Sequence, residues 1–219
     1  MKDFSAALSA CPLFAGVDPA QMPALFTCLQ GRIRTYDKGQ AILRQGERAE
    51  HLGAVLSGLV QIARVDDAGN RSLVAAVAPG ELFGETFAYA GVAALPVEAV
   101  AAAPTTALLL RADRIAQPCG RACAFHHRVL TNLLRILADK NVQLNEKLAV
   151  LSQRTTRDKL LTYLALQAQK TGSRRLTLPF NRQELADYLE VDRSGLSAEI
   201  SKLRRAGVLQ CQRNRFTLL

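Results

Sequence analysis

Short apolar runs separated by turn residues fill the first half of the chain. Between residues 32 and 111 the runs are rich in Val, Ile and Leu, and Gly, Asp or Pro residues follow most of them. Turns spaced roughly 8–12 residues apart are typical of a small β-sandwich or jelly roll. The expected strands are 32–36, 41–44, 52–56, 59–65, 72–77, 97–102 and 107–111.

Beyond Pro118 the apolar period becomes helical. From His127 the seam positions recur in alternating steps of three and four, every d position is leucine, and one a position is Asn141. Such an asparagine lowers stability but fixes the register and favours two parallel helices, in which the amides meet. The pattern predicts a dimerisation helix over 118–153 with the seam Leu130, Leu134, Leu137, Asn141, Leu144, Leu148 and Leu151. The alternative is a helix packed on its own domain, which does not need so strict a repeat.

A polar hinge over 154–159, a helix over 160–169 and a short strand over 174–178 are expected next. The stretch 181–205 then contains two short amphipathic segments separated by a three-residue turn.

The signals for these two helices coincide. Asn181 and Glu184 have the spacing of a capping box, Asp192 can cap the second segment, and Gly207 can end it. Two short helices joined in this way leave the second free to enter a DNA major groove. Residues 208–212 and 215–219 predict a hairpin, the wing. An ordinary helical hairpin is the structural alternative.

Charge is unevenly distributed. The chain has 219 residues, is 49% hydrophobic and carries a net charge of +9. Residues 1–110 hold 8 Lys/Arg against 10 Asp/Glu, residues 111–152 hold 7 against 3, and residues 153–219 hold 13 against 6. A basic C-terminal part beside a near-neutral N-terminal part favours a polyanion partner for the former, although a merely solvated basic surface would look similar.

Other function classes receive little support. No secretory signal is evident, and the apolar stretch 86–110 contains Pro96 and Pro104, which favours buried strands over a membrane span. Five cysteines without a signal indicate reduced thiols in the cytoplasm. We do not expect the protein to be an enzyme, because phosphate-loop, nucleophile-elbow and zinc-protease motifs are lacking and only three histidines are available.

Four segments carry a family resemblance: 43–47 (LRQGE), 57–58 (SG), 79–85 (PGELFGE) and 180–186 (FNRQELA). In these segments and in the order of its expected elements, the chain resembles the Crp/Fnr family of bacterial transcription regulators over nearly its whole length. The resemblance implies an α+β chain: a β-roll (jelly-roll) sensor over 1–117, a dimerisation helix over 118–153 and a winged helix-turn-helix over 154–219. It also implies a homodimer that binds double-stranded DNA with two-fold related half-sites and acts with RNA polymerase.

The second helix supplies the expected base contacts. Arg193 opens it and can contact guanine or a phosphate. Relatives often carry a glutamate and a second arginine where this chain has Ser194 and Ala198, so a TGTGA-type half-site is not expected. The exposed face is predicted to comprise Ser194, Ser197, Ala198 and Ser201, with phosphate contacts from Arg182, Lys202 and Arg213.

The effector stays open at this point. Cyclic-nucleotide-binding relatives use a glutamate after Phe-Gly for the ribose, which corresponds to Glu85 after Phe83 and Gly84. Their Arg-Ser pair for the cyclic phosphate aligns with Val97 and Glu98, and a carboxylate there would repel phosphate. Cyclic AMP is therefore not the expected ligand.

A second candidate for signal input lies at the start of the predicted dimerisation helix. Cys119, Cys123, His126 and His127 fall within two helical turns and could hold a metal ion, an iron–sulfur cluster or a haem, or form a redox pair. Buried thiols beside a surface histidine are the favoured interpretation.

A ligand-binding scaffold whose C-terminal domain docks a protein is the alternative to a regulator; a steep loss of DNA affinity with salt would identify the regulator.

Overall fold

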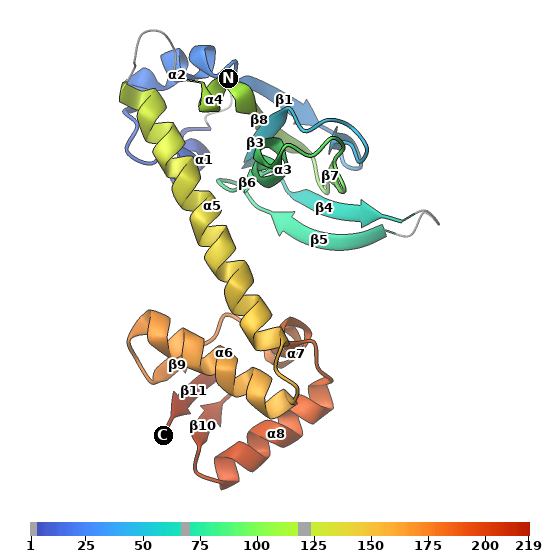
Figure 1. The fold of residues 1–219 in the computed structure, drawn as a ribbon, viewed down its shortest axis with the longest axis vertical. Coiled ribbons are helices and arrows are strands. Elements are labelled where there is room, and N and C mark those ends of the chain that lie inside the picture. The colour runs from blue at the N-terminus through green and yellow to red at the C-terminus, as the bar shows by residue number, and fades with distance from the viewer. Residues whose placement is uncertain (1–3, 67–70, 118–123) are drawn as a thin grey trace. The chain divides into compact units, whose positions relative to one another are not determined.

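The protein is described by a computed structural model that covers residues 4–66, 71–117 and 124–219 (Figure 1). The chain divides into two compact units, 1–138 and 139–219, and the long helix α5 (Ala124–Leu151) contributes to both. Each unit has its own apolar core.

The first unit starts with short helical segments, continues with strands and reaches α5 through a short helix. Its elements before α5 are α1 (Ser5–Ala10), η1 (Pro12–Phe14), η2 (Pro19–Gln21), α2 (Met22–Cys28), β1 (Arg32–Tyr36), β2 (Ala41–Leu43), β3 (His51–Ser57), β4 (Val60–Val65), β5 (Arg71–Val77), β6 (Leu82–Phe83), α3 (Glu85–Ala90), β7 (Glu98–Ala101), β8 (Thr105–Arg111) and α4 (Ala112–Ala116). The β-rich fold expected from the sequence is confirmed for this unit.

The strands form two antiparallel four-stranded sheets, in the orders β1-β8-β3-β6 and β2-β7-β4-β5. Alternation along β8 separates two cores. Leu108 and Leu110 pack with the N-terminal helices and α5, whereas Leu109 belongs to the cluster formed with residues of the second sheet. Gly53 is needed in β3 because a Cβ there would lie 2.1 Å from the ring of Phe83.

The seven expected strands lie close to their predicted positions, but the two-residue strand β6 and the helices between the strands were not expected. The stretch 86–110, expected to consist of buried strands, begins with residues of α3, and α4 follows β8 directly. Gly84 and Gly91, both at positive φ, bound α3 and allow a helix of only six residues between strands. Such a short helix has no sequence period to reveal it.

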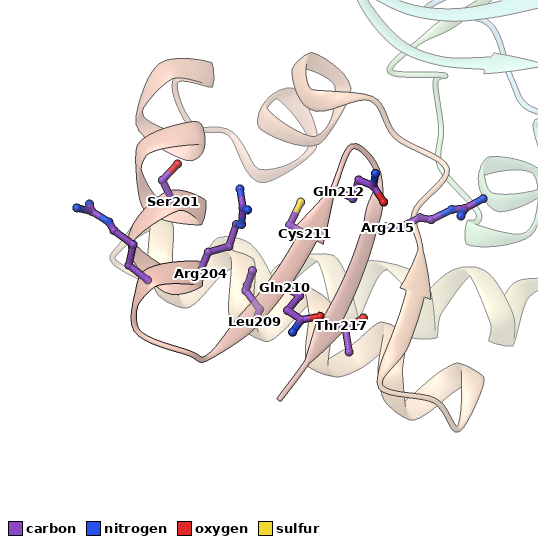
Figure 2. Close-up of a pocket in the computed structure, with 9 residues that line it drawn as sticks. Ser201, Arg204, Leu209, Gln210, Cys211, Gln212, Arg215 and Thr217 are labelled. Atoms are coloured by element: carbon purple, nitrogen blue, oxygen red, sulfur yellow. The ribbon is translucent and has the colours of Figure 1, made fainter.

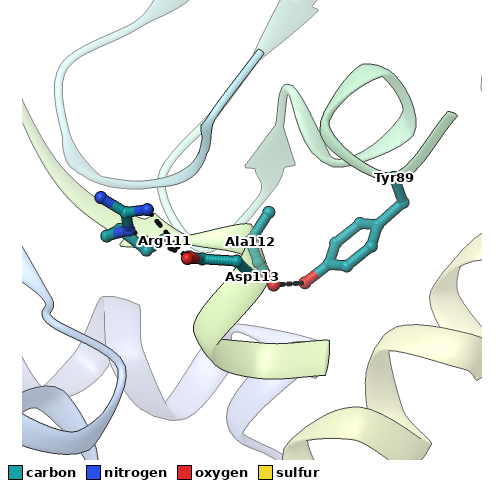
Figure 3. A network of polar contacts seen from close by, with 4 residues as sticks. All are labelled: Tyr89, Arg111, Ala112 and Asp113. Carbon is teal, nitrogen blue, oxygen red and sulfur yellow. Dashed lines mark hydrogen bonds and ion pairs between the residues drawn. The ribbon is translucent and has the colours of Figure 1, made fainter. Parts of the chain in front are cut away.

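A polar network joins these two short helices (Figure 3). The Tyr89 hydroxyl donates to the Ala112 carbonyl at 2.9 Å, and Arg111 donates to both oxygens of Asp113 at 2.9 and 2.8 Å. Burial, together with the Asp113 charge, raises the pKa of Tyr89, so its hydroxyl stays protonated as a donor.

One side of α5 is attached to the first unit. Val129 and Leu133 are fully or almost fully buried in its core. Between them Asn132 is buried and donates from Nδ2 to the carbonyls of Leu13 and Ala15, at 3.0 and 2.9 Å. These bonds fix the rotation of α5 about its axis relative to the N-terminal segments.

The second unit is a small α+β domain. Its elements after α5 are α6 (Thr156–Thr171), β9 (Arg175–Thr177), α7 (Arg182–Leu189), α8 (Arg193–Arg205), β10 (Leu209–Gln212) and β11 (Arg215–Leu218). The strands form a sheet in the order β10-β11-β9, and the core includes Leu160, Leu164, Leu185 and Leu203.

The polar hinge expected over 154–159 is wrong in extent. Helix α6 begins at Thr156, because Thr155 caps it by accepting from the Asp158 amide at 3.1 Å and donating to the Asp158 carboxylate at 2.7 Å. Polar residues of a capped first turn resemble a linker when only apolar periodicity is considered. Within the described ranges, no helix combines the length and apolar character needed to span a bilayer.

Replacement of Asn132 tests the attachment of α5. Asn132→Ala leaves two carbonyls in a buried position without their donor, so we expect the free energy of unfolding to fall by about 2–4 kcal/mol. Urea unfolding followed by circular dichroism measures this, since the chain contains no tryptophan. Asn145→Ala is the matched control: Asn145 is exposed on the same helix, and the change should be close to neutral. Equal effects of the two changes would contradict the assigned role.

Candidate nucleic-acid interface

The first helix of the candidate interface, α7, is held at its start by a reciprocal cap. Asn181 Oδ1 accepts from the amides of Gln183 and Glu184 at 2.9 and 3.0 Å, and Glu184 Oε2 accepts from the Asn181 amide at 2.7 Å. The capping box expected from the sequence is confirmed. Glu190, at φ 51°, ends the helix in the left-handed conformation and turns the chain toward α8.

The second helix, α8, is capped by Asp192 as expected. Its carboxylate accepts from the Gly195 amide at 2.8 Å and from the Ser194 hydroxyl. The Ser194 hydrogen bond first, and then the Gly195 amide, lower the pKa of Asp192 below its usual value. Leu196, Ile200 and Leu203 are buried, which leaves the opposite side of α8 to solvent.

That solvent-facing side contains the expected contact residues. Arg193, Ser194, Ser197, Ala198, Ser201 and Lys202 are all exposed. The hydroxyls of Ser197 and Ser201 donate to carbonyls four residues earlier, at 3.0 and 2.9 Å. Their oxygen atoms can still accept hydrogen bonds from a ligand.

The wing is the hairpin of β10 and β11. Gln212 pairs with Arg215, so the turn between them is Arg213-Asn214, with Arg213 at φ 53°. Asn214 donates from Nδ2 to the Leu178 carbonyl at 2.8 Å and thereby ties the turn to the segment after β9. The exposed side chain of Arg213 lies at this turn, where it was expected to contact phosphate.

Arg182 differs from its expected role as a phosphate contact. Its Nη2 donates to the Arg213 carbonyl at 3.2 Å and to the Cys211 sulfur at 3.4 Å, its Nη1 is buried, and its guanidinium lies 5.6 Å from the ring centre of Phe216. The side chain therefore joins α7 to the wing inside the domain. The position of Arg182 at the start of a helix does not reveal from the sequence that its side chain points inward.

A groove of about 950 Å³ separates α8 from the wing (Figure 2). Its lining residues are Ser201, Arg204, Arg205, Leu209, Gln210, Cys211, Gln212, Arg215 and Thr217. None of these nine described residues is acidic, and three are arginines. Of these residues, only Ser201 was predicted from the sequence to contact DNA. Arg204 and Arg205 lie three and four residues after Ser201 and therefore share its side of the helix.

The end of α5 packs against this domain through aromatic residues. Tyr163, Phe180 and Tyr188 lie with ring centres 5.1 to 6.3 Å apart, and Lys147 Nζ lies 4.5 Å from the centre of the Tyr188 ring. Glu146 forms an ion pair with Lys170 of α6. Burial raises the pKa of Tyr163 to about 12, in keeping with its position in the core. The last turns of α5 are thus part of the second unit.

Two family models match the chain. The model described as "Cyclic nucleotide-binding domain" matches residues 33–121, and the model described as "Crp-like helix-turn-helix domain" matches residues 158–219. The second range contains both short helices and the wing described above. The chain belongs to the Crp/Fnr family of DNA-binding transcription regulators.

Its relatives within this Crp/Fnr family are distant. The chain is 25% identical to the transcriptional activator protein FnrL of Cereibacter sphaeroides over 85% of its own length and 75% of the relative's. It is 28% identical to the cyclic AMP receptor protein of Thermus thermophilus, over 91% and 88% of the two lengths. The crystal structure of Thermus thermophilus catabolite activator protein superposes with a TM-score of 0.55 at 25% identity, over 95% of this chain and 93% of that one.

The positions that the family resemblance relates to a cyclic-nucleotide site lie mainly in the core of the β-roll. Phe83, Glu85 and Val97 are buried, and Glu98 is half-buried in β7. Glu85 Oε1 accepts from the Thr86 hydroxyl at 3.4 Å. An additional Cβ at Gly84 would lie 2.8 Å from Leu43. These positions are thus tightly packed in the Crp/Fnr sensor of this chain.

The second candidate input site is only partly described. Cys119 and Cys123 lie outside the described residues. His126 is buried and His127 is exposed, so these adjacent histidines have different surroundings. Over the residues that the structure describes, no cluster of three His, Cys, Asp or Glu side chains suits a metal ion.

Replacement of Ser194 tests the cap of α8. In Ser194→Ala the largest cause of the lowered Asp192 pKa is removed, so we expect that pKa to rise toward its ordinary value of 3.8. Because the folded-state pKa lies below the unfolded-state pKa, the carboxylate stabilises the fold above pH 3.8, and this contribution disappears as the pH falls through the folded-state value.

A carboxyl-carbon NMR titration with labelled aspartate measures the effect. Asp113 serves as the internal control, because its lowered pKa depends on Arg111 and should not change. An Asp192 pKa that stays the same or decreases in the variant would show that Ser194 has no part in the cap.

Proposed function

We propose that this Crp/Fnr regulator acts as a homodimer that binds a two-fold related DNA site through α8 and the wing, and that a signal at the first unit controls its DNA affinity. The observation that carries the proposal is the groove between α8 and the wing, with its arginine-rich lining and the exposed polar side of α8. A positively charged concave surface beside a helix of this kind suits a phosphate backbone on either side of a major groove.

The positions of the side chains support the following proposed contacts with DNA. Arg193 at the exposed start of α8 is proposed to contact base edges, with Ser197 and Ser201 as acceptors along the helix. Arg204 and Arg213, near the two ends of the interface, are proposed as phosphate contacts. Because the short side chains of Ser194 and Ala198 offer few base contacts, DNA shape is proposed to contribute more to sequence specificity.

Dimerisation through α5 is supported by the apolar residues of this helix that the chain leaves exposed. Leu134, Leu144 and Leu148 are 61%, 64% and 63% exposed, whereas Leu130 and Leu137 partly pack against the first unit. The exposed residues share the predicted heptad seam with Asn141, which is also exposed. A row of exposed leucines at heptad spacing is covered by a second copy of the same helix in a coiled coil.

Arg193→Ala tests the proposed base contact. On the highest-affinity duplex selected from a random pool, we expect an affinity loss of about 10- to 100-fold, because one bidentate base contact is removed. Arg204→Ala should instead weaken binding to all sequences and reduce the slope of log affinity against log salt by about one.

Fluorescence anisotropy at several salt concentrations separates these effects. Arg157→Ala is the matched control, because Arg157 is an exposed arginine of the same unit but lies on α6. If all three variants bind alike, α8 is not the DNA-reading element.

Aspartates in the seam test dimerisation. Leu144→Asp combined with Leu148→Asp places two like charges on each copy at the contact, so we expect a monomer in sedimentation equilibrium. Val142→Asp is the control: Val142 is 54% exposed on the same helix but lies off the seam, and that variant should remain dimeric. A double variant that is still a dimer would require another interface.

A further inference from the structure

A thiol and an imidazole that are 98 residues apart in the sequence meet in the first unit. Cys28 is the last residue of α2, and His126 lies in the first turn of α5. Cys28 Sγ lies 3.7 Å from His126 Nδ1, within the range of a hydrogen bond to sulfur. The cysteine is half-buried, while His126 is only 5% exposed.

The hydrogen bond of His126 Nε2 determines whether Nδ1 can accept a proton. His126 Nε2 lies 3.0 Å from the carbonyl oxygen of Ile115 in α4. A carbonyl oxygen only accepts hydrogen bonds, so Nε2 carries the proton and Nδ1 of the neutral ring has a lone pair. The Cys28 thiol is then the donor and Nδ1 the acceptor of its proton.

We propose that Cys28 and His126 form a reactive-thiol site for hydroperoxides, with His126 as the proton acceptor. The Cys28 proton moves to Nδ1, and the thiolate attacks one oxygen of hydrogen peroxide as the oxygen–oxygen bond breaks. The leaving hydroxide takes the proton from the imidazolium. Cys28 becomes a sulfenic acid, the peroxide is reduced to one water molecule, and the imidazole returns to its neutral form.

The Ile115 carbonyl supports this chemistry in both protonation states of the ring. It orients the neutral imidazole toward sulfur and also accepts a hydrogen bond from the imidazolium, which stabilises the charge. Thiolates paired with a histidine are the nucleophilic form of cysteine in proteins. Cys11, in contrast, is 1% exposed, and burial raises its pKa, which keeps it as an unreactive thiol.

The test measures the reaction of each of the five cysteines separately. The purified full-length protein is treated near neutral pH with iodoacetamide or, in parallel, with hydrogen peroxide, and reaction at each thiol is quantified by peptide mass spectrometry. No Lys or Arg lies between Cys11 and Cys28, so fragment ions are needed to separate these two. Rates are divided by those of the same thiols in the urea-unfolded chain.

We expect Cys28 to react about tenfold faster than Cys211, which is also half-buried, and to lose its thiol to peroxide in a form that a reducing agent restores. His126→Gln keeps an amide donor for the Ile115 carbonyl but removes the base, so the Cys28 rate should fall about tenfold while the Cys211 rate stays the same. His127→Gln, at the neighbouring exposed histidine, is the matched control and should leave both rates unchanged.

A Cys28 rate no higher than that of Cys211 in the unaltered protein would overturn the proposal, whatever the variants do. An unchanged Cys28 rate in a folded His126→Gln protein would also overturn it. Neither measurement involves DNA, so failure of this site is distinguishable from failure of the proposed DNA interface.

Discussion

The division of the α5 surface between two kinds of contact is the constraint on which the rest of the structure depends. Asn132 is bonded to two carbonyls of the N-terminal segment, and Val129 and Leu133 are buried beside it. On the same helix, Leu134, Leu144 and Leu148 are exposed. A buried, doubly bonded amide fixes the rotation of the helix within the first unit, so one side of α5 is covered there while Leu134 stays exposed.

In the DNA-binding unit the constraint is helix length, because α7 and α8 are too short to be stable as isolated helices. Asn181 with Glu184 and Asp192 with the Gly195 amide satisfy the first turns, and Arg182 joins α7 to the wing from inside the domain. Local caps thus determine where each helix begins, while one internal cation ties a helix to the hairpin. This internal scaffold leaves the outward arginines of the groove available to a ligand.

The first unit has the β-rich fold shared by the family. Phe83, Glu85 and Val97, which the family resemblance relates to the nucleotide contacts, are buried. Other polar contacts lie elsewhere, at the Arg111–Asp113 pair and at the contact of Cys28 with His126. The sheets of this unit are held together by apolar packing, so the fold alone does not specify a ligand.

The sequence by itself determined the elements whose signals are local or periodic: the strands between turn residues, the long helix α5, and the capped helices of the helix-turn-helix. Tertiary structure alone decided which side of α5 is covered, that Arg182 points inward, that Arg204, Arg205 and Arg215 share one groove, and that Cys28 meets His126. The reason is physical. Periodicity and caps act over a few neighbouring residues, whereas side-chain direction and contacts between residues 98 positions apart depend on how complete elements pack.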